Sequence, residues 1–204
     1  MFRSEILNTA QPPMFFDSKE FDFVSTLEKG WLDVKAELVK LQPKNFIDWP
    51  EKNIYNQGWE VFGLYAFEQR IEENCKLCPK TVQLIEKIPG MLTAGFSSLA
   101  PGTYIGPHFG ATNAVLRCHL GVVVPDNDCG IRVDKETKSW QEGKCLIFDD
   151  TYEHEAWNRS DRTRIVLLID FLRSNPNSTE KDFTDKDFDQ EYWLKILNQS
   201  EVRL

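Results

Sequence analysis

The sequence predicts a mostly β domain, a jelly roll supported by flanking helices. Beyond residue 93, short apolar segments alternate with turn residues at intervals of ~8–12 residues, which is typical of an antiparallel sandwich or barrel. Helical periodicity is confined to segments on either side of this stretch. A chain of 204 residues has the ordinary size of one domain and can bury a substantial core. We therefore expect a single domain over residues 1–204.

Residues 1–56 are predicted to form an N-terminal arm, a helix and a loop. Residues 1–18 mix polar and apolar positions, so we expect an arm that is disordered or laid on the surface. From Ser18 to Leu41, apolar residues recur at near-helical spacing among charges, which predicts one long amphipathic helix capped near Ser18. Pro43 ends this helix, and a loop over residues 42–56 follows.

Residues 57–173 are predicted to form the β core. Residues 58–67 alternate between apolar and polar positions and predict a strand. Pro79 suits the first position of a helix that closes at Pro89 and Gly90. Further strands are predicted at residues 93–99, 119–124, 130–133, 138–141, 144–148, 153–158 and 163–172. Residues 174–204 should supply a polar linker and a final helix.

Composition and charge exclude several classes of function. The net charge of −8 argues against nucleic acid as a partner, because such proteins need basic surface to neutralise phosphates. No apolar run approaches the ~18 residues that span a bilayer, and the N-terminus does not resemble a signal peptide. We expect a cytoplasmic protein without a membrane partner.

The cysteine pattern favours a structural role. Five cysteines make an odd number, which fits a reducing compartment better than a disulfide framework. Cys75 and Cys78 have the spacing of a redox motif or of half a zinc site. The sequence provides no second ligand pair and no βαβ frame, so we interpret them as structural.

The three histidines of the chain, His108, His119 and His154, fall within 47 positions. Each lies at the edge of a short apolar run. A jelly roll gathers strand ends around one open mouth, where side chains from distant strands can meet. Neutral imidazole is the commonest protein ligand for transition metals, so this part of the chain is predicted to hold a metal site.

The pattern of ligands leaves alternatives open. Two histidines on different strands, with coordination positions left free, suit a non-haem Fe(II) centre. The usual carboxylate two residues after the first histidine is replaced by Gly110. The third ligand could be Asp149 or Asp150, which also fit a plain turn, or the site could use two histidines and solvent. His119 could be a ligand, or a neutral donor that orients an anionic co-substrate.

Arg164 is a candidate anion-binding residue. It directly precedes the apolar run Ile165–Ile169, and a charge in a buried strand is costly unless it meets a partner. A dicarboxylate co-substrate would provide one, since guanidinium matches a carboxylate with two parallel hydrogen bonds. An internal salt bridge is the alternative.

Five ordered blocks of the sequence resemble the aspartyl/asparaginyl β-hydroxylase family, with similarity from about Trp59 to Arg173. The blocks are residues 97–103, 107–113, 116–121, 142–144 and 148–158. The resemblance implies a double-stranded β-helix fold and a dioxygenase that depends on Fe(II) and 2-oxoglutarate. In such enzymes 2-oxoglutarate is decarboxylated to succinate while a hydroxyl group replaces hydrogen on an unactivated C–H bond.

The resemblance also assigns expected roles to residues. It implies that His108 and His154 ligate iron, and that glycine at position 110 is normal for the family. The expected 2-oxoglutarate contacts are Trp59, Ser97, Arg117, His119 and Arg164. Among them, Arg164 and Ser97 would hold the distal carboxylate, while Arg117 and His119 would lie toward the metal-binding end.

The sequence departs from the family pattern at two positions. Val115 stands where the animal enzymes carry an arginine thought to hold the acidic substrate side chain. Val82 replaces a cysteine that pairs with the equivalent of Cys75 in the secreted-pathway members. The chain also lacks their membrane anchor and helical repeats, so we expect a free-standing catalytic domain.

We therefore expect a hydroxylase whose partners are 2-oxoglutarate, dioxygen and an unidentified peptide or small-molecule substrate. That substrate would be a peptidyl aspartate or asparagine, a free amino acid or a related small molecule. An acyl chain is less expected, because lipid-modifying relatives tend to carry membrane-associating apolar segments. The alternatives are a non-catalytic jelly-roll binding or sensor module, and a cupin-like metalloenzyme with all three histidines on the metal.

Overall fold

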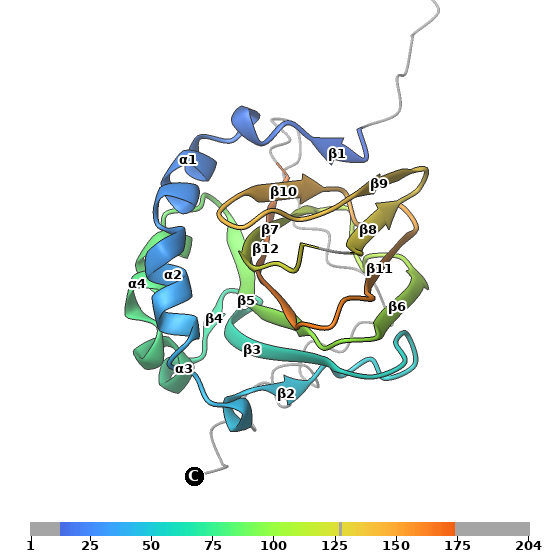
Figure 1. Ribbon diagram of the computed structural model, residues 1–204. Helices are drawn as coiled ribbons and strands as arrows, with labels where there is room; N and C mark the ends of the chain where they lie inside the picture. The colour runs from blue at the N-terminus through green and yellow to red at the C-terminus, as the bar shows by residue number, and fades with distance from the viewer. Residues whose placement is uncertain (1–12, 127, 174–204) are drawn as a thin grey trace, which may run out of the picture.

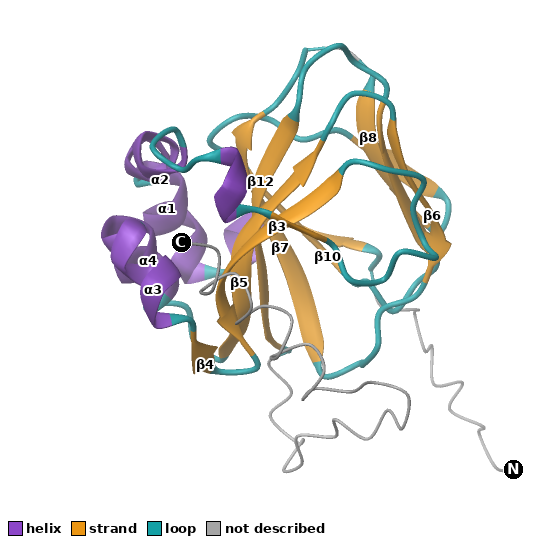
Figure 2. Ribbon diagram, turned by 90° about the horizontal axis from the view of Figure 1, so that it is seen from below, coloured by secondary structure: helices purple, strands orange, loops and turns teal. Residues whose placement is uncertain are grey.

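The structure is a computed structural model that describes residues 13–126 and 128–173. Two antiparallel sheets face each other, and helices cover the outer face of the larger sheet (Figures 1 and 2). This arrangement confirms the predicted jelly roll with flanking helices. Most of the predicted N-terminal arm and the whole predicted final helix lie outside the described residues.

The larger sheet has the strand order β1 (Phe15–Phe16), β10 (Cys145–Phe148), β7 (Val115–Val123), β12 (Arg164–Leu172), β5 (Met91–Leu99), β3 (Trp59–Ala66) and β2 (Ile47–Asp48), with β4 (Gln69–Arg70) also beside β3. The smaller sheet has the order β6 (Thr103–His108), β11 (His154–Asn158), β8 (Cys129–Val133) and β9 (Glu136–Lys138). The helices are α1 (Asp22–Lys29), α2 (Trp31–Leu38), α3 (Glu72–Leu77) and α4 (Pro79–Ile85). None of the described helices is long and apolar enough to cross a bilayer.

Strand β12 corresponds to the strand predicted over residues 163–172, and its packing explains why its sequence is a nearly continuous apolar run. Its Val166 and Leu168 pack into the core between the two sheets. Leu167, Ile169 and Phe171 pack into a second core beneath the helices. A strand covered on both faces needs apolar side chains at nearly every position.

The single helix predicted over residues 18–41 is wrong. A 3₁₀ turn at Ser18–Glu20 precedes two helices of eight residues each, α1 and α2, which meet at Gly30. A β-carbon at position 30 would stand 2.5 Å from a methyl carbon of Leu84 on α4. Glycine therefore allows α4 to approach the junction closely, a contact that periodicity alone does not reveal.

Other boundaries also differ from the prediction. Strand β7 begins at Val115 rather than at residue 119, and β9 spans Glu136–Lys138 rather than residues 138–141. Helix α3 and strand β6 were not predicted. Strand β6 contains Gly106 and Pro107, which interrupt a strand pattern; it lies at the edge of its sheet, where proline is tolerated.

The two cysteines of the C-x-x-C sequence lie in the core beneath the helices. The Cys75 thiol donates a hydrogen bond to the Leu64 carbonyl. Burial raises the pKa of Cys75 to about 11 and that of Cys78 to about 12. Thiols protonated to such high pH are poor nucleophiles and poor metal ligands, which supports a structural role.

Candidate active site

The register of the smaller sheet brings His108 and His154 together. His108 is the last residue of β6 and His154 the first of β11, and their α-carbons are direct partners across the two strands. Their ring centroids are 4.0 Å apart. A bulge separates this pair from the next one, Ala156 with Ile105. Such irregularities re-aim side chains, and this one coincides with Gly106 and Pro107.

Backbone carbonyls fix the orientation of both rings. Nδ1 of His108 lies 2.8 Å from the Gly106 carbonyl, and Nδ1 of His154 lies 3.0 Å from the Tyr152 carbonyl. A carbonyl only accepts, so each Nδ1 carries the proton and each Nε2 keeps its lone pair. Burial lowers the pKa of both rings, that of His154 to about 3. Both imidazoles are therefore neutral at pH 7, the form that binds metals.

Asp150 fills the room that a side chain at position 110 would need. A β-carbon on Gly110 would stand 2.5 Å from both carboxyl oxygens of Asp150. The Asp150 side chain is 2% exposed, and its Oδ1 has no hydrogen-bond partner. Burial raises the pKa of this carboxyl to about 6. Asp150 thus brings a carboxyl group close to the histidine pair. It is not the residue two positions after the first histidine, which usually supplies a carboxylate.

The neighbouring Asp149 has a different environment. Its Oδ1 accepts hydrogen bonds from the backbone and hydroxyl of Thr151, at 3.1 and 2.6 Å. Its Oδ2 accepts from Arg173 at 2.6 Å. Through these contacts Asp149 stabilises a turn. Across the described residues, no three His, Cys, Asp or Glu side chains are grouped to hold a metal.

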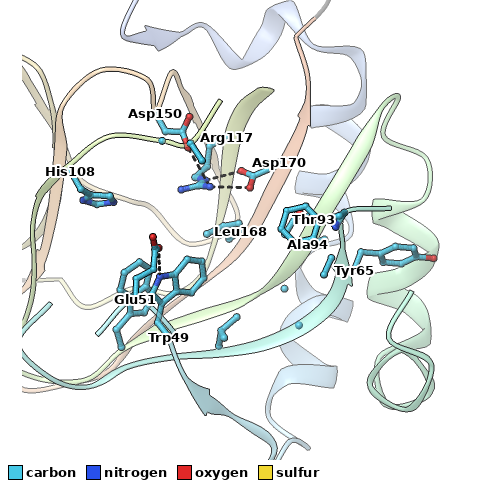
Figure 3. A pocket seen from close by; sticks show the side chains of 18 of the residues that line it. Trp49, Glu51, Tyr65, Thr93, Ala94, His108, Arg117, Asp150, Leu168 and Asp170 are labelled. Atoms are coloured by element: carbon cyan, nitrogen blue, oxygen red, sulfur yellow. Dashed lines mark hydrogen bonds and ion pairs between the residues drawn. The ribbon is translucent and has the colours of Figure 1, made fainter. Parts of the chain in front are cut away.

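Arg117 is held by two acidic side chains. Its Nε and Nη2 donate to the two carboxyl oxygens of Asp170 at 2.7 and 2.9 Å, and Nη2 lies 3.3 Å from Asp150 (Figure 3). Asp170 is not among the site residues expected from the sequence. A lone acid between Ile169 and Phe171 in an apolar strand was the available signal, since such a charge needs a partner.

Arg164 is buried without an acidic partner among the described residues. The residue is 2% exposed. Its Nη1 donates to the Ser97 carbonyl at 3.2 Å, and its guanidinium lies 4.5 Å from the centre of the Trp140 ring. Its Nε has no hydrogen-bond partner. Burial lowers the pKa of Arg164 to about 10, so it still carries its charge at pH 7. The described structure therefore contains no salt bridge of the kind considered as its alternative role.

His119 and Trp59 complete this second polar region. Nδ1 of His119 accepts a hydrogen bond from Trp140 at 3.1 Å, so its Nε2 carries the proton, and that buried N–H has no partner. Burial lowers the pKa of His119 well below its usual value. Trp59 donates to the Ser97 hydroxyl at 3.1 Å. Unpaired N–H groups on His119 and Arg164 are a reason to expect an anion beside them, because unpaired buried donors are costly.

The depressed pKa of His154 predicts a pH dependence of stability in the metal-free protein. Between pH ~6.5 and ~3 the unfolded chain binds a proton at this position while the folded chain does not. The free energy of unfolding should therefore fall as the pH is lowered, by up to ~1.4 kcal/mol per pH unit. The free energy of unfolding, measured with urea at several pH values across this range, should fall less steeply with decreasing pH in His154→Gln than in the wild-type protein. Equal slopes in both proteins would contradict the assigned environment of His154.

The aspartyl/asparaginyl β-hydroxylase family model matches residues 28–174, which is most of the chain. The chain is 43% identical over 171 residues to an ornithine lipid ester-linked acyl 2-hydroxylase of Rhizobium tropici, covering 79% of this chain and 61% of that protein. It is 40% identical over 159 residues to the human aspartyl/asparaginyl β-hydroxylase, covering 73% of this chain and 21% of that protein. It thus spans less than two thirds of either relative.

Among solved structures, an oxidoreductase of the 2OG-Fe(II) oxygenase family from Burkholderia pseudomallei superposes with a TM-score of 0.50 at 12% identity. The match covers 71% of this chain and 79% of that one, and it shows a shared fold. The family model and the two relatives agree with the resemblance carried by the five sequence blocks. The chain belongs to the aspartyl/asparaginyl β-hydroxylase family.

Proposed function

We propose that the protein is a hydroxylase that uses Fe(II), 2-oxoglutarate and dioxygen to place a hydroxyl group on an unactivated C–H bond. One observation carries the proposal: a pair of neutral histidines with unprotonated Nε2 atoms shares a barrel with the buried Arg164, which has no acidic partner among the described residues. Its predicted cytoplasmic location remains part of this proposal.

The residues fit a metal held by two histidines. Nε2 of His108 and Nε2 of His154 are the free ligand atoms, and the carbonyls behind them preset the tautomer that binds metal. A centre with only two protein ligands leaves room for a chelating co-substrate and for dioxygen. Asp150, beside Gly110, adds a buried carboxyl to the surroundings of this centre.

The second polar region fits a dicarboxylate. Arg164, with Ser97 next to it, would bind the distal carboxylate of 2-oxoglutarate, and the His119 N–H would donate to the end nearer the metal. Bound in this way, the co-substrate would supply the partners that Arg164 and His119 lack. Trp59 would act through its hydrogen bond to Ser97. Arg117 would act through its ion pair with Asp150, which lies beside Gly110, while Asp170 holds the other side of its guanidinium.

Iron and 2-oxoglutarate supply the oxidising chemistry when bound. The chain's contribution is to bind, orient and exclude water. His119, His154 and Arg164 are all buried, so charges in this region are poorly screened and the electrostatic contacts are strong. The rigid sheets that carry these side chains fix their positions before the ligands arrive.

The alternatives from the sequence have less support. A metal bound by three histidines would need His119 as a ligand, but the hydrogen bond from Trp140 leaves its Nε2 protonated. A non-catalytic binding module would not need neutral, paired histidines beside the anion-binding region. The names of the relatives suggest two kinds of substrate, a lipid acyl group and an aspartyl or asparaginyl residue.

Succinate release tests the proposed reaction. The wild-type protein with Fe(II) and 2-oxoglutarate should form succinate only when dioxygen is present. His108→Ala should abolish this release while changing the free energy of unfolding little, because His108 is the last residue of β6 and is only partly buried. Succinate formation at the wild-type rate in His108→Ala would contradict the metal assignment.

Arg164→Ala should raise the 2-oxoglutarate concentration needed for half-maximal succinate formation by at least ~30-fold, since losing one partner of a buried charge pair costs ~2–5 kcal/mol. The matched control is Arg162→Ala, whose exposed side chain lies 3.3 Å from Asp126 and should have little effect. If both variants changed the KM for 2-oxoglutarate equally, Arg164 would not be its binding residue.

Gly110→Ala should weaken Fe(II) binding by at least ~10-fold, because the new methyl group would displace the buried Asp150 carboxyl beside the site. Thr137→Ala on the exposed strand β9, which contributes no residue to the site, is the control. Anaerobic titration monitored by tryptophan fluorescence measures both affinities. Unchanged affinity in Gly110→Ala would show that Asp150 does not constrain the centre.

A further inference from the structure

One buried side chain, that of Trp140, contacts both His119 and Arg164. Its indole Nε1 donates a hydrogen bond to Nδ1 of His119 at 3.1 Å. The centre of its ring lies 4.5 Å from the guanidinium carbon of Arg164. Across the described residues, three buried side-chain polar atoms have no hydrogen-bond partner, and His119 Nε2 and Arg164 Nε are two of them. Trp140 therefore contacts both side chains that carry the unpaired donors of the proposed co-substrate site.

The backbone of β7 sets the position of Trp140. Gly121 follows His119 by two residues on this strand, and a β-carbon at position 121 would stand 2.2 Å from the Gln141 carbonyl oxygen. The Gly121 carbonyl accepts a hydrogen bond from the Gly143 N–H at 2.8 Å. Glycine at position 121 thus lets the segment between β9 and β10, which contains Trp140, bond directly to the strand that carries His119.

The indole determines which nitrogen of His119 carries the proton. An indole N–H can only donate, so Nδ1 of His119 is the unprotonated nitrogen and Nε2 carries the hydrogen. In His108 and His154 the order is reversed, because backbone carbonyls accept from Nδ1. Of the three histidines in the chain, His119 is thus the one whose Nε2 can donate to an anion.

Packing alone does not account for this hydrogen bond. Trp140 is 4% exposed and belongs to the core between the two sheets, so it also contributes to stability. The bond satisfies the indole N–H, but the buried N–H of His119 is left without a partner. The number of unpaired buried donors does not fall, so the protein alone gains little from the arrangement. An anion that accepts from His119 Nε2 would satisfy the remaining donor.

The contact between the Trp140 ring and Arg164 orients the guanidinium and leaves its charge available. An aromatic face attracts a cation without neutralising it, whereas a carboxylate would neutralise it. Among the described residues Arg164 has no acidic partner, and its Nη1 donates to the Ser97 carbonyl at 3.2 Å. The ring therefore supports the guanidinium while the charge remains free to pair with a carboxylate from a ligand.

We propose that Trp140 is a positioning residue for the co-substrate and acts at both of its ends. Its N–H selects the His119 tautomer that donates to the end nearer the metal, and its ring holds Arg164 at the distal carboxylate. This inference rests on the proposed function and adds a residue that is not among those expected from the sequence. Because two parts of the indole act on two side chains, substitutions can separate the two effects.

The first experiment needs neither iron nor co-substrate. Nitrogen NMR of the histidine rings in the isotope-labelled, metal-free protein at neutral pH should show one Nε2–H tautomer, from His119, and two Nδ1–H tautomers. Trp140→Phe keeps an aromatic ring but removes the N–H, so His119 should then populate both tautomers. Three Nδ1–H tautomers in the wild-type protein would overturn the proposal without any variant. An unchanged His119 signal in Trp140→Phe would overturn it as well.

Anaerobic titrations of the Fe(II)-loaded protein separate the two contacts. They compare 2-oxoglutarate with 2-oxovalerate, in which a methyl group replaces the distal carboxylate. Trp140→Phe should weaken the binding of both acids by the same factor, about fivefold for one lost hydrogen bond, since His119 serves the end that they share. Trp140→Leu also removes the ring from Arg164. It should weaken 2-oxoglutarate binding by a further factor of ~3 or more, with no further loss for 2-oxovalerate.

The matched control is Trp157→Phe. Trp157 on β11 also donates its N–H, to Asp128 at 3.0 Å, and its ring also faces an arginine, Arg159, at 5.1 Å. It contacts neither of the residues proposed to bind the co-substrate carboxylates, so its substitution should change neither affinity. Equal further weakening of both acids by Trp140→Leu would refute the positioning of Arg164, and the same losses in Trp157→Phe would refute the role of Trp140.

The titrations also separate this inference from the proposed function. If neither acid bound the Fe(II)-loaded wild-type protein, the proposed function would fail, and the co-substrate role of Trp140 would fail with it. If 2-oxoglutarate bound the wild-type protein and the variants at position 140 equally well, the proposed function would stand and only the positioning role would be refuted.

Discussion

The pairing of β6 with β11 is the constraint on which the site depends. It sets two histidines, 46 positions apart in sequence, opposite each other at the ends of adjacent strands. Carbonyls two residues before each ring hold both Nδ1–H groups, so the same local geometry orients both free nitrogens. A register shift of one residue would turn one ring to the other face of the sheet and destroy the pair. The smaller sheet therefore determines the geometry of the proposed metal site, and the larger sheet supplies the remaining residues proposed for the site.

The larger sheet contributes a buried positive charge and an internal ion pair. Arg164 at the start of β12 lies deep between the sheets, where an unpaired charge is costly. Further along the same strand, Asp170 is compensated by Arg117 within the protein. Strand β12 thus carries one charge, on Asp170, that is paired within the protein, and a second, on Arg164, that has no acidic partner among the described residues. Between them Leu168 lines the pocket that also contains His108.

The sequence predicted features that depend on chemistry close to each residue. The jelly roll followed from short strands and turns, and β12 from its apolar run. The clustering of three histidines, with an arginine next to a buried strand, indicated a metal and an anion. Strand β6, which carries His108, was missed because Gly106 and Pro107 obscure its pattern, although an edge strand tolerates both.

Features that depend on packing between distant segments could not be predicted. The contact between Gly110 and Asp150 joins two loops, and the break at Gly30 depends on Leu84.

Anaerobic titration with Fe(II) and 2-oxoglutarate tests whether the histidine pair and the buried arginine form one site, because a chelated iron–oxoacid complex has a visible charge-transfer band. We expect this band in the wild-type protein and its loss in His108→Ala, with saturation at much higher 2-oxoglutarate in Arg164→Ala. Fe(II) binding without the band would show that the histidine pair and the buried arginine do not form one site.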